Sequence, residues 1–181
     1  MSFLEKVRKP EGLPIRKTAL FCVMFVILGA AAGAFSKLAD VYSEILGSFT
    51  SGMCIWIFLG TLICARTKSP FRAAAYVLLF CAGMIAAYYL TAELGELYYS
   101  RRFVRGWSVF TLFTPIFAVI AWYAKGRGAL SWGIRLGIVA VMLCSVFLFS
   151  GHIVLDPLVT AAAFAVTINK RKDKTKERKS L

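Results

Sequence analysis

The sequence predicts an all-α fold, a single bundle of six transmembrane helices, and three observations lead to this prediction. Of the 181 residues, 59% are hydrophobic and 17% are charged, whereas a soluble domain is usually about 45–50% apolar and about a quarter charged. The apolar residues gather in runs long enough to cross a bilayer, and the basic residues gather between alternate runs. The high hydrophobicity excludes a disordered chain, and five cysteines are too few for a disulfide scaffold.

Six apolar runs approach the roughly 20 residues that a helix needs to cross the hydrocarbon layer. They are residues 19–36, 46–65, 73–92, 107–124, 129–149 and 153–169. Only Ser150, Gly151 and His152 separate the last two runs. Because one helix of the combined length would overshoot a bilayer, we expect a tight hairpin at this point. Six spans place both termini on the same side of the membrane.

Charged residues mark the ends of these runs in order along the chain. The second run stops at Arg66, and the third begins after Arg72 and stops at Glu93. The fourth run stops at Lys125, and the fifth holds Arg135 near its start. We expect the long side chain of this arginine to snorkel to the nearby headgroups.

The positions of lysine and arginine predict the orientation. Eighteen of the 22 basic residues lie in the leader, in the tail, or in and beside the two loops that six spans put on the same side. The positive-inside rule therefore places both termini in the cytoplasm, and we expect the bundle to lie in the plasma membrane. We interpret the formal net charge of +13 as this topology signal and as attraction to anionic lipid headgroups. We expect no nucleic-acid binding, because no domain outside the membrane is predicted to carry a reading surface.

The whole chain, 1–181, is predicted to be one transmembrane domain, with a basic leader at 1–17 and a basic tail at 170–181. A second interpretation of the N-terminus exists. The leader, the first apolar run and the small residues 32–34 together resemble a secretory signal with its cleavage site. We expect the first run to be retained as a span.

Small residues form a ridge on the first predicted span. Gly29 and Gly33 are four apart, and so are Ala30 and Ala34. Such spacing lets another helix backbone approach closely, and close packing drives helix association in lipid. The ridge is therefore interpreted either as a contact with neighbouring spans of the same chain or as a docking face for a partner subunit.

The predicted outer surface carries more charge than a plain bundle needs. Lys37, Asp40 and Glu44 follow the first span at three- and four-residue spacing, which places them on one helical face if the helix continues. Further candidates for binding a small polar solute follow the third span, namely Glu93, Glu96, Arg101 and Arg102. Carboxylates and guanidinium groups on one surface suit a polar or zwitterionic solute. The alternative is a solvated loop with weak ion pairs.

Asp156 is the strongest single candidate, because it lies within the sixth apolar run, four residues after His152. Ionisable groups inside a span are costly and indicate a functional site by default. We expect a buried role, paired with Lys37, His152 or an arginine. The alternative is structural: Asp is a favoured helix N-cap, and Pro157 suits the first helical position.

The residues that common intramembrane chemistries require are missing. The one histidine has no spaced ligands for zinc and no Gly-x-Ser-x-Gly elbow for a serine hydrolase. An aspartyl site needs two facing carboxylates, and Asp156 alone is expected inside the membrane. No Gly-x-x-x-x-Gly-Lys loop is present to hold a nucleotide. We expect no enzyme activity, no metal and no cofactor.

Two resemblances add to these predictions. Residues 28–40, LGAAAGAFSKLAD, and residues 51–74, SGMCIWIFLGTLICARTKSPFRAA, with the Tyr88-Tyr89 pair and Pro115, resemble an uncharacterised family of small bacterial six-span membrane proteins. That resemblance implies a fold and no activity. Size and span count are also similar to the S components of energy-coupling-factor transporters. Those proteins bind a solute from outside and dock through an Ala-xxx-Ala ridge, a spacing that Ala30 and Ala34 share.

The sequence thus leads to two functional expectations. The first is a membrane-embedded solute-binding or transport subunit that opens outward and lacks its own energy source. The second is a non-transporting accessory or regulatory protein that packs against a partner complex. A solute-binding subunit needs a pocket between its spans, whereas an accessory protein does not.

Overall fold

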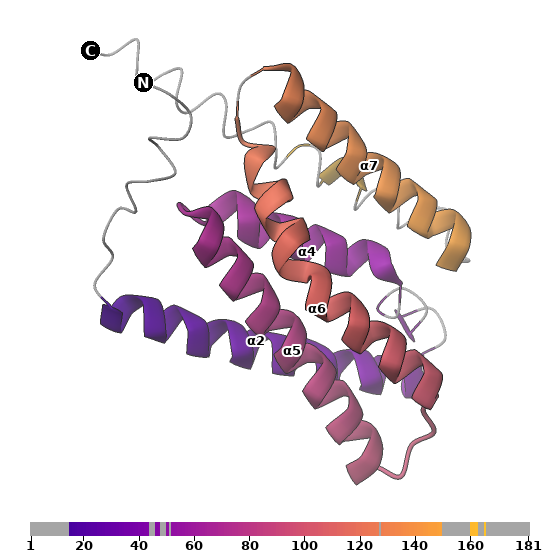
Figure 1. Cartoon of the computed structure of the whole chain (residues 1–181). Coiled ribbons are helices and arrows are strands. Elements are labelled where there is room, and N and C mark those ends of the chain that lie inside the picture. The colour runs from indigo at the N-terminus through magenta and orange to yellow at the C-terminus, as the bar shows by residue number, and fades with distance from the viewer. Residues whose placement is uncertain are drawn as a thin grey trace.

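The computed structural model describes residues 15–43, 46–47, 50, 52–126, 128–149, 160–162 and 165. The elements with defined bounds in these ranges are all helices, which confirms the all-α prediction for this part of the chain. They are α2 (Ile15–Tyr42), α4 (Met53–Arg66), α5 (Pro70–Leu94), α6 (Arg101–Tyr123) and α7 (Ala129–Phe149). In Figure 1, the axes of α5, α6 and α7 are roughly aligned, with α6 running opposite to the other two, and α2 and α4 cross them. Most of the sixth predicted run, and the hairpin before it, lie outside the described residues.

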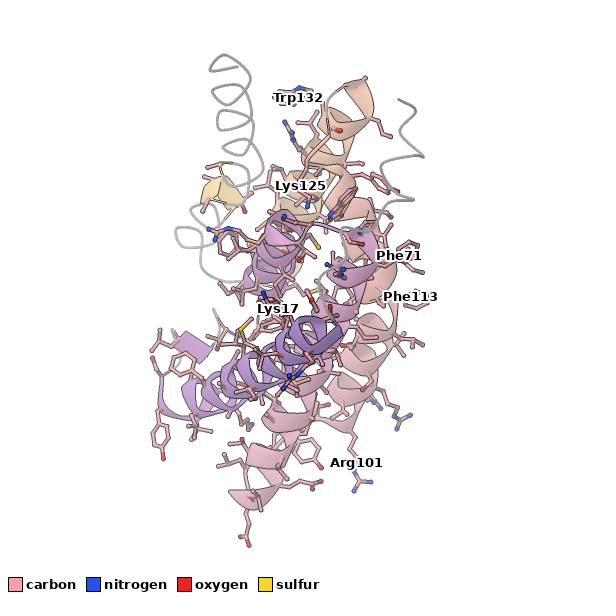
Figure 2. The ribbon with its side chains drawn as sticks, turned by 90° about the vertical axis from the view of Figure 1, so that its left-hand side faces the viewer. Lys17, Phe71, Arg101, Phe113, Lys125 and Trp132 are labelled. Carbon is pink, nitrogen blue, oxygen red and sulfur yellow. The ribbon has the colours of Figure 1, made fainter. Side chains whose placement is uncertain are left out.

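Three stretches of helix are long and apolar enough to cross a membrane: Arg16–Tyr42, Pro70–Leu94 and Val104–Tyr123. They correspond to the first, third and fourth predicted runs. Their surfaces fit contact with lipid, because large apolar side chains are exposed along them. Phe71 and Phe113, for example, are 73% and 48% exposed and project outward from the bundle (Figure 2). By length and composition, these helices indicate a membrane protein.

The second predicted run is interrupted, so α4 is shorter than expected. It begins at Met53 and has 14 residues, which gives a length of about 21 Å. The break occurs at Gly52, whose backbone is extended, with φ −69° and ψ 146°. Just before it, the Thr50 carbonyl oxygen accepts hydrogen bonds from the side chains of Trp56 (2.8 Å) and Ser36 (3.4 Å). These side chains hold the chain in place beside α2 where the helix is broken.

The boundaries of α5 and α6 follow their capping residues. The helix α5 begins with Pro70 at its first position after the extended Ser69, a position where proline loses no helical hydrogen bond. The helix α6 begins at Arg101, six residues before its predicted start at Trp107, after the extended Ser100. Arginines in a first turn interact unfavourably with the helix dipole. Because they are polar, a search for apolar runs also places the start of this helix too late.

The core of the bundle lies where α4, α5 and α6 meet. Its buried members are small or aromatic, and they are Cys64, Ala73, Val77, Phe80, Cys81 and Ala118. The thiol of Cys64 donates to the Ala118 carbonyl oxygen at 3.4 Å. The five cysteines are free thiols, and three of them are buried.

The most extensive helix pair joins α2 to α5. Gly29 lies against the backbone of Phe80, and Gly33 lies against the backbone of Met84; a Cβ at either glycine would overlap a carbonyl oxygen. Both contacts advance by four residues on each helix, so the two helices run parallel. The glycines are therefore required for the close approach of the two backbones.

Candidate functional site

A polar cluster lies at one end of the bundle, which we call the tyrosine end because Tyr88, Tyr89, Tyr98 and Tyr99 gather there. Lys37 of α2 is the central cation of this cluster. Its side chain is only 5% exposed, and its Nζ donates to the Tyr98 carbonyl oxygen at 2.9 Å. The same ammonium lies 5.2 Å from the centroid of the Tyr88 ring. A buried ammonium requires such partners, because desolvation of an unpaired charge is costly.

Asp40 lies one turn further along α2 and contacts the same tyrosine. The Tyr88 hydroxyl donates a hydrogen bond to its carboxylate oxygen Oδ2. One phenol of α5 therefore interacts with a cation through its ring and with an anion through its hydroxyl. The prediction that Lys37 and Asp40 belong to one helix is confirmed, and Tyr88 is the residue that brings their two charges together.

A second pair of groups continues the cluster toward solvent. The Tyr99 hydroxyl donates to Oε1 of Glu93 at 2.8 Å. This hydrogen bond, helped by the nearby negative charge, raises the pKa of Tyr99 above its usual value. Tyr89 packs between the neighbouring phenols, with ring centroids 5.1 Å from Tyr88 and 5.3 Å from Tyr99.

A cavity of about 40 Å³ lies beside this cluster, between α2, α4, α5 and α6. Its walls are aromatic, aliphatic and hydroxyl side chains, and they are Ser36, Thr50, Trp56, Met84, Ile85, Tyr88, Tyr89 and Trp107. A cavity needs about 10–15 Å³ of such volume to hold one water molecule. The space therefore accommodates about three waters or a solute of comparable size.

None of the four solute-binding residues predicted around the end of the third span lines this cavity. Glu93, Glu96, Arg101 and Arg102 are exposed to solvent, and Arg101 projects from the end of the molecule opposite Lys125 (Figure 2). Glu96 occupies the turn after α5 with a positive φ of 51°. Of the predicted set, Lys37 and Asp40 belong to the cluster beside the cavity, and the four residues around the end of α5 lie at the surface. The predicted pair His152 and Asp156 lies outside the described residues.

The predicted docking ridge is divided between two environments. Gly29 and Gly33 are buried against α5 of the same chain, so these two glycines are not open to a partner while α2 packs on α5. Ala30 and Ala34 are half-buried beside them. The two glycines therefore agree with the first interpretation of the ridge, in which it contacts a neighbouring span of the same chain.

The opposite end of the bundle carries a different polar arrangement, built around Arg135. This side chain is 4% exposed, and its guanidinium donates to the carbonyl oxygens of Ala124 (2.8 Å) and Gly126 (3.4 Å). The expectation that Arg135 snorkels to the headgroups is therefore wrong. Its charge binds carbonyl groups at the C-terminus of α6, where the helix dipole favours a cation.

Beside Arg135, the end of α6 is tied to the loop between α4 and α5. The Thr67 carbonyl oxygen accepts hydrogen bonds from the Trp122 indole (3.0 Å) and from the Lys125 ammonium. Lys125 also lies 4.6 Å from the Trp122 ring centroid. These contacts fix loop geometry, and we assign this end of the bundle a structural role.

Sequence reasoning missed the cavity walls, above all Thr50, Trp56 and Tyr88. One signal for Tyr88 was present in the sequence. A phenol within an apolar span needs a hydrogen-bond partner, and Asp40 at the end of another span needs a donor. Both groups lie near the same side of the predicted bundle, so they form a natural pair.

Fold and site together describe a helical membrane protein with a buried polar cluster and a small cavity at one end. Comparison with protein-family models, with curated proteins and with solved structures finds no match to this chain.

Proposed function

We propose that the protein is a membrane-embedded solute-binding or transport subunit, and that the cavity at the tyrosine end is its solute site. The observation that carries the proposal is the position of this cavity beside Lys37, which is 5% exposed, and beside the Asp40–Tyr88 pair. Ionisable residues within membrane spans are costly and mark solute or ion pathways. The sequence has no phosphate-binding loop, so energy for transport would come from another chain.

The proposed topology is six spans with both termini in the cytoplasm and the tyrosine end facing outward. Five described basic residues around the opposite end support this orientation, namely Arg66, Lys68, Arg72, Lys125 and Arg135, whereas the tyrosine end has four, namely Lys37, Arg101, Arg102 and Arg105. The described acidic residues all belong to the tyrosine end, and they are Asp40, Glu93 and Glu96. This asymmetry follows the positive-inside rule, and the basic end is proposed to contact anionic lipid headgroups in the plasma membrane.

Labelling of single cysteines tests the orientation. In a variant without native cysteines, Glu96→Cys and Arg101→Cys are expected to react with a membrane-impermeant thiol reagent in intact cells. Lys68→Cys is expected to react only after the membrane is permeabilised, because its loop faces the cytoplasm. The reverse pattern of labelling would contradict the proposed topology.

Solute binding is tested on the full-length protein in detergent, with thermal unfolding and tryptophan fluorescence as readouts. Trp56 and Trp107 line the cavity, so a solute that enters it is expected to change their emission. The panel contains compact amines, carboxylates and neutral amides at matched ionic strength. At least one class is expected to raise the melting temperature and to change the fluorescence in a saturable way.

A matched pair of variants locates the binding. Ile85→Phe adds bulk to the cavity wall and is expected to abolish the effect. Ile116→Phe makes the same change on the exposed surface of α6, where Ile116 is 56% exposed, and is expected to leave the effect intact. If no class of solute gives an effect that depends on Ile85, the solute-binding proposal is refuted. Non-transporting accessory function then becomes the better interpretation.

A further inference from the structure

We infer that the cavity binds a compact ammonium group, either ammonium itself or a small primary amine. This inference rests on the solute-binding function proposed above and names the chemical class of the solute. Three properties of the cavity carry it: the direction of the hydrogen bonds in its walls, the aromatic rings that enclose it, and its volume.

Most of the hydrogen-bond donors that are placed in the walls already donate to protein acceptors. Ser36 and Trp56 donate to the Thr50 carbonyl oxygen, the Thr50 hydroxyl donates to the Leu46 carbonyl oxygen at 2.8 Å, and the Tyr88 hydroxyl donates to Asp40. The oxygen lone pairs of these hydroxyls remain as acceptors. A solute that enters therefore meets acceptors more often than donors, which favours a group rich in N–H bonds.

Tyr89 supplies a hydroxyl that is not already used. Its ring is half-buried in the wall, and within the described ranges its hydroxyl makes no hydrogen bond to the protein. A phenol oxygen accepts a hydrogen bond from an ammonium group, and this charged hydrogen bond is stronger than a neutral one.

Four aromatic side chains contribute to the walls, namely Trp56, Tyr88, Tyr89 and Trp107. Their π faces attract cations, and Trp does so most strongly. One of these rings already interacts with an ammonium group beside the cavity, because Nζ of Lys37 lies 5.2 Å from the Tyr88 ring centroid. Carboxylates and other anions find little to bind on such walls.

The charges around the cavity do not oppose a second cation strongly. Lys37 is countered by Asp40, since both contact Tyr88. The other described cations of this end, Arg101, Arg102 and Arg105, are exposed, and water and salt screen exposed charges. Glu93 and Glu96 add negative charge at the surface of the same end.

The volume limits the solute. About 40 Å³ corresponds to about three water molecules on the scale at which 10–15 Å³ holds one. Ammonium and methylammonium fit this space. Tetramethylammonium, which is larger and has no N–H bond, does not.

The experiment titrates the full-length protein in detergent with methylammonium chloride, with tetramethylammonium chloride, sodium acetate and formamide as comparison probes. Saturable changes in tryptophan fluorescence and in melting temperature are expected with methylammonium alone. Tyr89→Phe is expected to weaken its binding roughly tenfold or more, through loss of a charged hydrogen bond. Trp107→Leu is expected to weaken it roughly 2- to 30-fold, through loss of a cation–π contact.

Tyr98→Phe is the matched control, because the Tyr98 side chain is 89% exposed and lies on the same end of the molecule outside the cavity. The Tyr98→Phe variant is expected to bind methylammonium as strongly as the unmodified protein.

The outcomes separate the two proposals. If acetate or formamide binds, Ile85→Phe abolishes that binding, and methylammonium does not bind, the ammonium assignment is overturned and the solute-binding function is retained. Methylammonium binding that neither Tyr89→Phe nor Trp107→Leu weakens would overturn the assignment to this cavity. Absence of binding by every probe would overturn both proposals.

Discussion

Replacing Gly33 by alanine is expected to destabilise the protein by about 1–3 kcal/mol, the range typical of overpacked interiors. The added methyl group would overlap the carbonyl oxygen of Met84. The position of the added Cβ is fixed by the α2 backbone, and the oxygen that it meets belongs to the α5 backbone. No side-chain rotation relieves the overlap, so α2 has to move away from α5. Equilibrium unfolding of the detergent-solubilised protein measures the effect.

Gly137→Ala is the matched control for this change. Gly137 lies in α7, and a Cβ at this position meets no atom within 4 Å. Alanine favours a helix over glycine by about 0.8–1 kcal/mol, so this variant is expected to be as stable as the original protein or slightly more stable. Equal destabilisation by both substitutions would show that the α2–α5 contact is not the cause.

Replacing Arg135 by methionine is expected to lower the free energy of unfolding by about 1.5–3 kcal/mol, the range for hydrogen bonds to charged groups. Methionine fills much of the same space but leaves the carbonyl oxygens of Ala124 and Gly126 without the donors that Arg135 supplies. Because the guanidinium is buried, the loss is expected to depend little on salt.

Two further variants separate the capping role from a general effect of charge. Arg135→Lys keeps the positive charge but loses the planar fork that reaches two oxygens, and it is expected to recover only part of the stability. Arg66→Gln removes an exposed cation from the same end and is expected to change stability by less than about 0.5 kcal/mol. A loss with Arg66→Gln as large as that with Arg135→Met would refute the capping role.

The apolar runs predicted the positions of most helices because hydropathy records which residues avoid water. The third run, at residues 73–92, lies within α5 (Pro70–Leu94), and the fifth coincides with α7 (Ala129–Phe149). The second run failed at its start, since the break at Gly52 is a backbone feature within an apolar sequence. Hydropathy does not detect a change of backbone direction between residues of similar polarity.

The candidate site was predicted only in part, for a different reason. Lys37 and Asp40 stood out because charges at the end of an apolar helix need partners. The partners themselves lie far away in sequence: Tyr88 contacts Asp40 across 48 residues, and the Tyr98 carbonyl binds Lys37 across 61 residues. Helical spacing describes neighbours on one helix, whereas these pairs depend on how α2 packs against α5. That packing depends on the contacts of Gly29 and Gly33 with α5, and the sequence alone did not identify α5 as the helix that they contact.

The parallel pairing of α2 with α5 has a consequence for biogenesis. Gly29 and Phe80 are in contact, yet about 50 residues separate them, which is roughly 3–10 s of synthesis at 5–20 residues per second. During that interval α2 has entered the membrane, but the helix that covers its glycine face has not yet left the ribosome. The nascent chain therefore carries an uncovered helix surface in the bilayer, open to lipid, to an insertion factor or to a neighbouring copy. Slow synthesis of the α4–α5 region would prolong this exposure, so we expect the rate of translation there to affect how much protein assembles correctly.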